Sequence, residues 1–166
     1  MIADEARGDI AMETTEKIVE AYARYIKRWA TIPNVRCGEQ KEIDLFAIDP
    51  VTDERFHIET SVSISSGFSK LNDKPYEANE HKVRVKQASA RRKLGYFIEH
   101  KFEPSPVHDE LIKLGCDPAD IGKTMVTWDA SPTAIASAEA AGVKVWLLPR
   151  MMKEIADEIG DGRSYY

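Results

Sequence analysis

Hydrophobic and polar residues alternate along residues 42–63, on both sides of a short polar break. The segment reads EIDLFAID, then PVTD, then ERFHIETSVS. A period of two on both sides of such a break predicts a strand, a turn and a second strand. A hairpin that folds symmetrically about Val51 and Thr52 places Asp44 directly opposite Glu59.

Asp44 and Glu59, placed opposite each other, are the first candidate functional residues in the chain. Directly opposed side chains have Cβ atoms about 4.5–5.5 Å apart, and like charges at this distance destabilise a sheet. A cation or a shared proton between the two carboxylates would remove the repulsion. The pattern also allows two solvated acids on a hairpin edge, displaced by a one-residue slip or a bulge near Pro50.

The rest of the chain predicts helices and strands around this hairpin. Helical spacing and Pro33 define the first helix, and Gly95 is expected to end a basic helix. Before the hairpin we expect a helix over 13–31 and a short strand over 34–37. After the hairpin we expect a loop over 65–79, the basic helix over 80–94, a strand over 95–102 and a short helix over 104–116.

The clearest unit predicted after them is a parallel strand-helix-strand, followed by a last helix. Ser131 caps the helix of this unit, Pro132 occupies its first turn and Gly142 ends it. The expected fold class is therefore α/β: a mixed sheet flanked by helices in three layers, with the antiparallel part first. We expect one domain over residues 13–160, with a flexible lead-in at 1–12 and a tail at 161–166. The strand-helix-strand is expected over 124–129, 132–141 and 143–148, and the last helix over 150–159.

Composition indicates a globular protein, because 43% of the 166 residues are hydrophobic and 31% are charged. No apolar run approaches the roughly 20 residues of a membrane span, and we expect a cytoplasmic protein without a membrane partner. Cys37 and Cys116 are too few for a disulfide framework and lie outside any zinc-binding spacing.

Charge is unevenly distributed along the chain. The formal net charge is −5, yet residues 61–103 hold nine basic and five acidic side chains. Such a segment, directly after the carboxylate hairpin, could collect phosphate groups of a nucleic acid. The lysines that we expect to do so are Lys70, Lys82, Lys86 and Lys93. A solvated helix face is the alternative explanation.

The segments EIDLFAID and HIETS, together with the order of the elements, resemble the PD-(D/E)XK nuclease superfamily, which has the restriction-endonuclease-like fold. Members carry an Asp on the second strand and an acid-x-Lys on the third, which Asp44 and Glu59 match here. The resemblance implies that these two acids and the main-chain carbonyl of Thr60 hold Mg²⁺ or Mn²⁺. It also implies hydrolysis of DNA phosphodiester bonds by a water activated at this metal.

One position departs from the family pattern, since Ser61 stands where the superfamily has its lysine. A serine hydroxyl is neutral and cannot offset charge on a scissile phosphate. Lys70, Lys82 and Lys86 are the nearest candidates in the sequence for the missing cation, and Gln87 could orient a water. The alternative is a catalytically degenerate member that acts as a subunit binding nucleic acid or protein.

Other polar and aromatic residues have simpler explanations. His57 shares the face of Glu59, where it is either a buried sheet histidine or a metal or phosphate contact. Trp128 and Trp146 are expected in the core. A homodimer or a protein partner is possible from the sequence, as is an unrelated α/β domain that binds a small ligand at the ends of the parallel strands.

Overall fold

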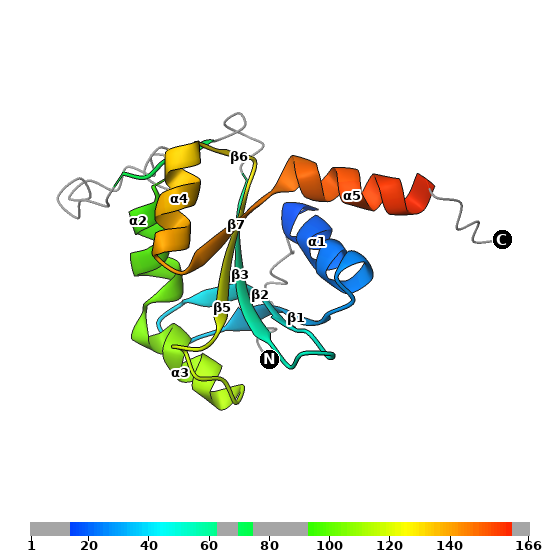
Figure 1. Ribbon diagram of the computed structural model, residues 1–166. Coiled ribbons are helices and arrows are strands. Elements are labelled where there is room, and N and C mark those ends of the chain that lie inside the picture. Colours follow the sequence, from blue (N-terminus) through cyan, green and yellow to red (C-terminus); the bar gives the residue numbers. More distant parts are fainter. Residues whose placement is uncertain (1–13, 63–69, 75–92, 161–166) are drawn as a thin grey trace, which may run out of the picture.

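A five-stranded mixed sheet forms the centre of the molecule. The computed structural model describes residues 14–62, 70–74 and 93–160. In the sheet order β1-β2-β3-β5-β7, the first two pairs of neighbouring strands are antiparallel and the last two are parallel. The expected α/β class, with the antiparallel part first, is confirmed (Figure 1). The strands are β1 (Ala30–Arg36), β2 (Glu42–Ile48), β3 (Arg55–Ser61), β5 (Gly122–Thr127) and β7 (Val143–Leu147).

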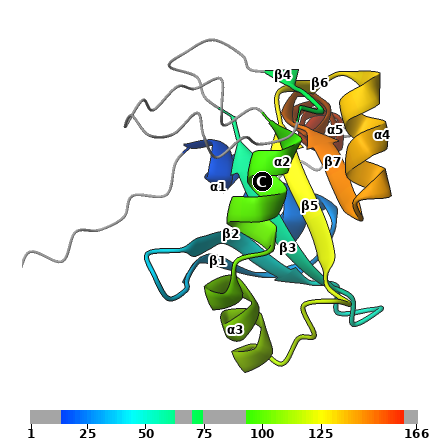
Figure 2. The same cartoon turned by 90° about the vertical axis from the view of Figure 1, so that its left-hand side faces the viewer.

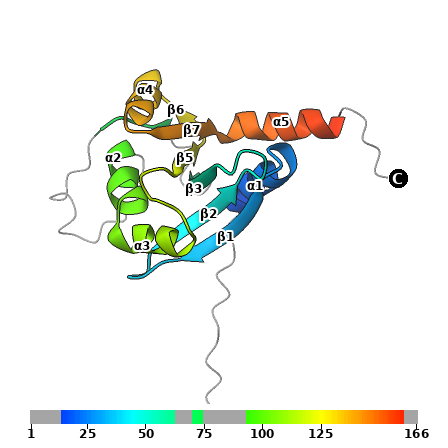
Figure 3. The ribbon, with the colours of Figure 1, turned by 60° about the horizontal axis from the view of Figure 1, so that its bottom comes forward.

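Helices lie on both faces of the sheet (Figures 1 and 3). One face carries α1 (Thr14–Ala21), its π-helical continuation η1 (Tyr22–Ile26), and α5 (Leu148–Gly160). None of the helices within the described ranges has the length and apolar character needed to cross a membrane. The other face carries α2 (Leu94–Phe97), the π-helical turn η4 (Ile98–Phe102), α3 (Ser105–Lys113) and α4 (Pro132–Ala140).

The core is divided by the sheet. On the α1/α5 face, Leu45 and Ile58 are buried, and Trp29 stacks on Phe56 with the ring centroids 4.1 Å apart. Successive residues of a strand point to opposite faces. Asp44, Phe46, His57 and Glu59 therefore point to the face that carries α2, η4 and α3, where Phe46 packs with Val107 and Leu111 of α3.

The hairpin folds in the predicted register. Leu45 pairs with Ile58 and Phe46 with His57, as the predicted register requires, and Asp44 and Glu59 directly follow the last pair and are both buried. In the turn, the Asp49 carboxylate accepts the Val51 N–H at 2.8 Å. The alternative of two acids displaced onto a solvated hairpin edge is therefore wrong.

The first helix and the first strand differ from their predicted ranges. The helix was expected over 13–31, but α1 and η1 end at Ile26 and β1 starts at Ala30. Pro33 lies inside β1, opposite Leu45, rather than closing a helix. An edge strand tolerates proline because one side of its backbone has no ladder partner.

The prediction of a strand over residues 95–102 is wrong, because this segment is helical. Leu94, Phe97 and Phe102 are buried there, and the first two lie one helical turn apart. A short apolar run does not by itself distinguish a strand from a buried helix. Gly95 lies inside α2 instead of ending a helix. Of the predicted basic helix 80–94, residues 80–92 lie outside the described residues.

The predicted strand-helix-strand is present as β5, α4 and β7, followed by α5. Ser131 Oγ accepts the Ala134 N–H at 3.1 Å, and Gly142 follows α4 with φ of 75°. Within the predicted loop 65–79 the structure describes residues 70–74. They include β4 (Lys70–Leu71), which pairs in parallel with β6 (Asp129–Ala130). The predicted lead-in 1–12 and tail 161–166 lie outside the described residues.

Candidate functional site

Two carboxylates from neighbouring strands meet on the α2 face of the sheet. The described pairs of the β2–β3 ladder end at Leu45 and Ile58, and beyond them the acids bond to main-chain groups. Asp44 Oδ2 accepts the Thr60 N–H at 2.7 Å, and Glu59 Oε1 accepts the Asp44 N–H at 3.4 Å. Glu59 is 0% exposed and Asp44 is 7% exposed. The two acids therefore form one buried cluster, as the sequence predicted.

The Lys101 ammonium lies between these carboxylates. Its Nζ is 2.7 Å from Glu59 Oε2 and 3.4 Å from Asp44 Oδ1. Lys101 belongs to η4, which lies with α2 in front of β3 and β5 in Figure 2. Its side chain keeps 30% of its surface exposed, so Lys101 is the most exposed member of the cluster. A positive charge between the two acids is thus supplied by Lys101 of η4.

His57 contacts the same cluster from within β3. Its Nε2 is 2.7 Å from Glu59 Oε1, and its ring meets Phe102 edge-on with centroids 4.8 Å apart. The imidazole is fully buried. His57 is therefore a buried sheet histidine in contact with a candidate metal ligand, rather than a ligand of its own.

Burial shifts both acids toward their neutral forms, and repulsion by Glu59 adds to the shift of Asp44. Burial, followed by the nearby Glu59, raises the pKa of Asp44 to about 6, against the opposing pull of Lys101. Burial raises the pKa of Glu59 to about 7. Burial opposes a charged Lys101, but Glu59 and Asp44 outweigh it and raise the pKa of this ammonium. Burial lowers the pKa of His57 to about 3, so its imidazole is neutral near pH 7.

Carboxyl groups that titrate near neutral pH are typical of functional sites. With pKa values of about 6 and 7, the two carboxyls titrate close to neutral pH beside an ammonium that stays charged. The net charge of the cluster therefore changes in this pH region.

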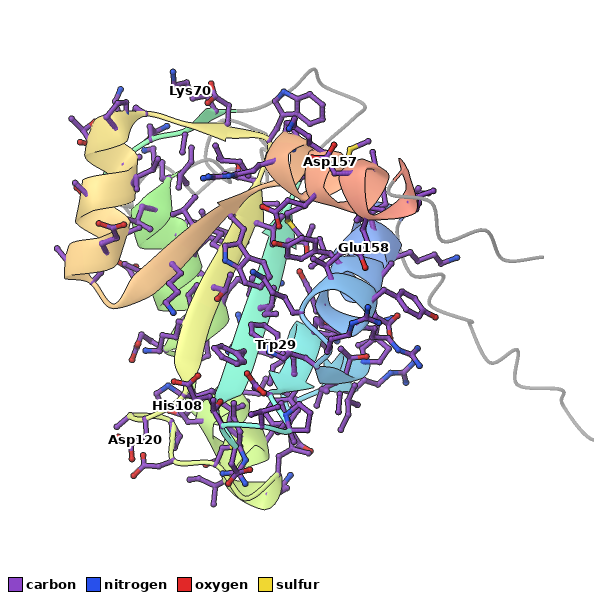
Figure 4. All side chains as sticks on the ribbon, turned by 45° about the vertical axis from the view of Figure 1, so that its right-hand side comes forward. Trp29, Lys70, His108, Asp120, Asp157 and Glu158 are labelled. Atoms are coloured by element: carbon purple, nitrogen blue, oxygen red, sulfur yellow. The ribbon has the colours of Figure 1, made fainter. Side chains whose placement is uncertain are left out.

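The other residues predicted for the site do not all join it. Ser61 is half-buried at the end of β3, paired with Thr127 of β5. Lys70 is exposed and pairs with Asp129 at 3.5 Å, far from His108 in Figure 4. His108 Nε2 is 2.9 Å from the Phe102 carbonyl, next to Lys101 in the chain. Lys70 thus contacts Asp129, whereas Lys101 contacts both acids, and the role of Lys70 in binding nucleic acid stays a prediction.

Three further predicted residues, Lys82, Lys86 and Gln87, lie outside the described residues, and their proposed roles stay predictions. Lys93 has an extended backbone in front of α2 and bridges to Asn72. Its role in binding nucleic acid also stays a prediction.

Sequence reasoning missed Lys101. The error follows from reading residues 95–102 as a strand, where Lys101 had no defined position relative to the hairpin. In the helical segment Phe97 and Phe102 are buried, and Lys101, next to Phe102, contacts the acids of the hairpin. The remaining signal was that Lys101 belongs to the basic segment 61–103.

The donor set of the cluster fits a hard divalent cation. Mg²⁺ prefers oxygen ligands, keeps several waters and is commonly held by one or two carboxylates together with substrate phosphates. Asp44 and Glu59 supply such oxygens. Across the described ranges, no group of three or more His, Cys, Asp or Glu side chains is suited to enclose a metal. The carboxylate oxygens of Asp44 and Glu59 are thus of the type that such an ion binds, and Lys101 Nζ lies against both of them.

Comparison of the chain with protein-family models, with curated proteins and with solved structures finds no match.

Proposed function

We propose that this chain is a divalent-metal-dependent nuclease of the restriction-endonuclease-like class that hydrolyses DNA phosphodiester bonds. The observation that carries the proposal is the convergence of Asp44, Glu59 and the Lys101 ammonium, with Nζ 2.7 and 3.4 Å from the two carboxylates. The positions of the acids on the second and third strands, and a mixed sheet flanked by helices, support the same class.

Each residue of the cluster would have a defined role. Oxygens of Asp44 and Glu59 would hold the ion, with the Thr60 carbonyl as the third protein ligand that the resemblance implies. When bound, a divalent ion lowers the pKa of a coordinated water and polarises the phosphate. Lys101 supplies the positive charge that Ser61 cannot, and its partly exposed side chain can turn toward a phosphate oxygen.

The proposal is tested by incubating purified protein with supercoiled DNA, linear DNA and RNA in Mg²⁺ or Mn²⁺. We expect DNA cleavage that EDTA abolishes and that Asp44→Asn lowers by a factor of 100 or more, about the effect of losing one strong electrostatic contact in a transition state. Asp109→Asn, the same change at an exposed position of α3, is the matched control. Undiminished cleavage by the Asp44→Asn protein would refute this site.

A second candidate function follows from the position of Lys101. An ammonium that already contacts both carboxylates can take the place of the metal, and the site would then have no catalytic activity. The chain would then be a degenerate relative that binds nucleic acid or a protein partner. This alternative predicts no turnover with either metal, and the appearance of cleavage in Ser61→Lys would support a decayed site.

A further inference from the structure

His57 lies within hydrogen-bonding distance of Glu59. The two residues alternate along β3 and point to the same face, with Nε2 2.7 Å from Oε1. The imidazole is 0% exposed, and the edge-on contact with Phe102 holds its plane. The ring therefore has no room to turn away from the carboxylate.

The proton of the neutral imidazole can be assigned from its surroundings. An ionised carboxylate only accepts hydrogen bonds, so with Glu59 ionised its contact with Nε2 requires the proton to be on Nε2. Nδ1 is buried and has no hydrogen-bond partner within the described residues. A proton on Nδ1 would leave a buried N–H donor unsatisfied and would remove the donor to Glu59. The favoured tautomer therefore has Nε2–H donating to Glu59 and a bare Nδ1.

The two oxygens of Glu59 have different surroundings. Oε1 contacts His57 Nε2 at 2.7 Å and accepts the Asp44 N–H at 3.4 Å. Oε2 is buried and lies 2.7 Å from Lys101 Nζ. One oxygen is thus fixed by the protein and the other is presented to a cation.

We propose that His57 is a positioning residue, whose Nε2–H fixes Glu59 Oε1 so that Oε2 faces Lys101 and a bound divalent ion. The part that concerns the ion rests on the proposed function. Hydrogen bonds to ligating carboxylates typically account for a factor of about 10–100 in metal affinity. Phe102 links both sides of the site, because it packs on His57 and follows Lys101 in the chain.

Two substitutions separate positioning from packing. His57→Gln keeps an N–H donor near the place of Nε2 but removes the ring, whereas His57→Phe keeps a ring against Phe102 and removes the donor. Mn²⁺ affinity is measured by calorimetry, and thermal unfolding reports the fold. We expect His57→Phe to lose about 10–100-fold in affinity. His57→Gln should lose clearly less.

The opposite order, with His57→Phe close to wild type and His57→Gln impaired, would show that the ring acts by packing alone and would overturn the proposal. Asp44→Asn, which removes a proposed ligand, sets the level of lost binding, and Asp109→Asn is the neutral control.

A measurement on the unmodified, metal-free protein keeps the proposal testable when a variant fails to fold. Long-range ¹H–¹⁵N correlation spectra of the His57 ring, recorded above the pKa of about 7 of Glu59 so that this acid is ionised, should show the proton on Nε2 and a bare Nδ1. A proton on Nδ1 would overturn the proposal. Absence of Mn²⁺ binding by the wild-type protein would instead count against the proposed function, while the Nε2–H tautomer would still support positioning of Glu59.

Discussion

Glu59 is a buried acid whose ionised form destabilises the folded protein. Burial raises its pKa from the ordinary 4.5 to about 7, although Lys101 is 2.7 Å away. A group whose pKa is higher in the folded than in the unfolded state binds more protons when folded. The stability that it contributes is present below pH 4.5 and is lost as the pH rises toward 7. The protein therefore retains this carboxylate at a cost in stability, which is common in active sites.

Glu59→Gln should remove this pH dependence. Relative to wild type, the variant should gain on the order of 1–3 kcal/mol of unfolding free energy between pH 4 and pH 8, since one pKa unit corresponds to ~1.4 kcal/mol. Urea unfolding of both proteins at several pH values measures the gain. Glu139→Gln, on the exposed surface of α4, should show no such trend. A difference between Glu59→Gln and wild type that stays constant with pH would contradict the assignment.

Lys101→Met should destabilise the protein strongly, because it leaves Asp44 and Glu59 buried without a cation. Removing one partner of a buried ion pair costs about 3–5 kcal/mol. The loss should be largest at pH 8 and smaller at pH 5, where the acids, with pKa values of about 6 and 7, are mostly protonated. Denaturant unfolding at both pH values tests this.

The control for this change is Lys144→Met, at an exposed position of β7, which should stay within about 0.5 kcal/mol of wild type. Equal losses in Lys101→Met at pH 5 and pH 8 would show that the side chain acts through packing and not through its charge.

At this scale the sequence predicted part of the site. The meeting of Asp44 and Glu59 is a local property, because a short turn and a period of two determine the hairpin register. Lys101 joins them only through the packing of a later helix on the sheet, and no local pattern encodes that contact. The same limit applies to the contact between Phe102 and His57.

The elements were predictable where local signals agreed. Period-two alternation identified the β2–β3 hairpin, and the Ser131 cap together with Gly142 identified α4 and its flanking strands. Residues 95–102 are short and apolar, so both a strand and a helix matched their pattern. The π-helical turns η1 and η4 also depart from the 3.6-residue period on which helix predictions rest.

The close approach of Gly122 on β5 to Phe56 on β3 can be tested by a single substitution. A Cβ on Gly122, at the start of β5, would lie 2.7 Å from Cδ1 of Phe56. Phe56 cannot move aside easily, because it is stacked on Trp29 at 4.1 Å. Gly122→Ala should therefore destabilise the protein by about 1–3 kcal/mol, as overpacked sites do.

Gly160→Ala is the matched control for this substitution, since a Cβ at the end of α5 meets nothing within 4 Å. Urea unfolding should show wild-type stability or slightly more. Comparable losses in both variants would contradict the close approach of β5 to Phe56.

For the whole molecule, the uneven distribution of charge along the chain can be related to the position of the candidate site. Residues 61–103 hold nine basic and five acidic side chains in a chain of net charge −5. The segment begins at Ser61, two residues after Glu59 on β3, and its end carries Lys101, which contacts both acids. Both ends of the segment thus lie next to the candidate site. If the chain binds DNA as proposed, we expect the DNA to contact this side of the molecule.

The salt dependence of DNA binding tests this inference. Each phosphate neutralised on duplex DNA contributes about 0.9 to the slope of log K against log salt. In EDTA and on an Asp44→Asn background, which prevents cleavage, replacing Lys82, Lys86 and Lys93 with Ala should lower the slope by about 2–3. The same change at three exposed lysines of α1, β7 and α5 should leave the slope nearly unchanged: Lys17, Lys144 and Lys153. Equal effects of the two triple variants would mean that the basic segment is a solvated surface, because a general loss of positive charge would then explain both.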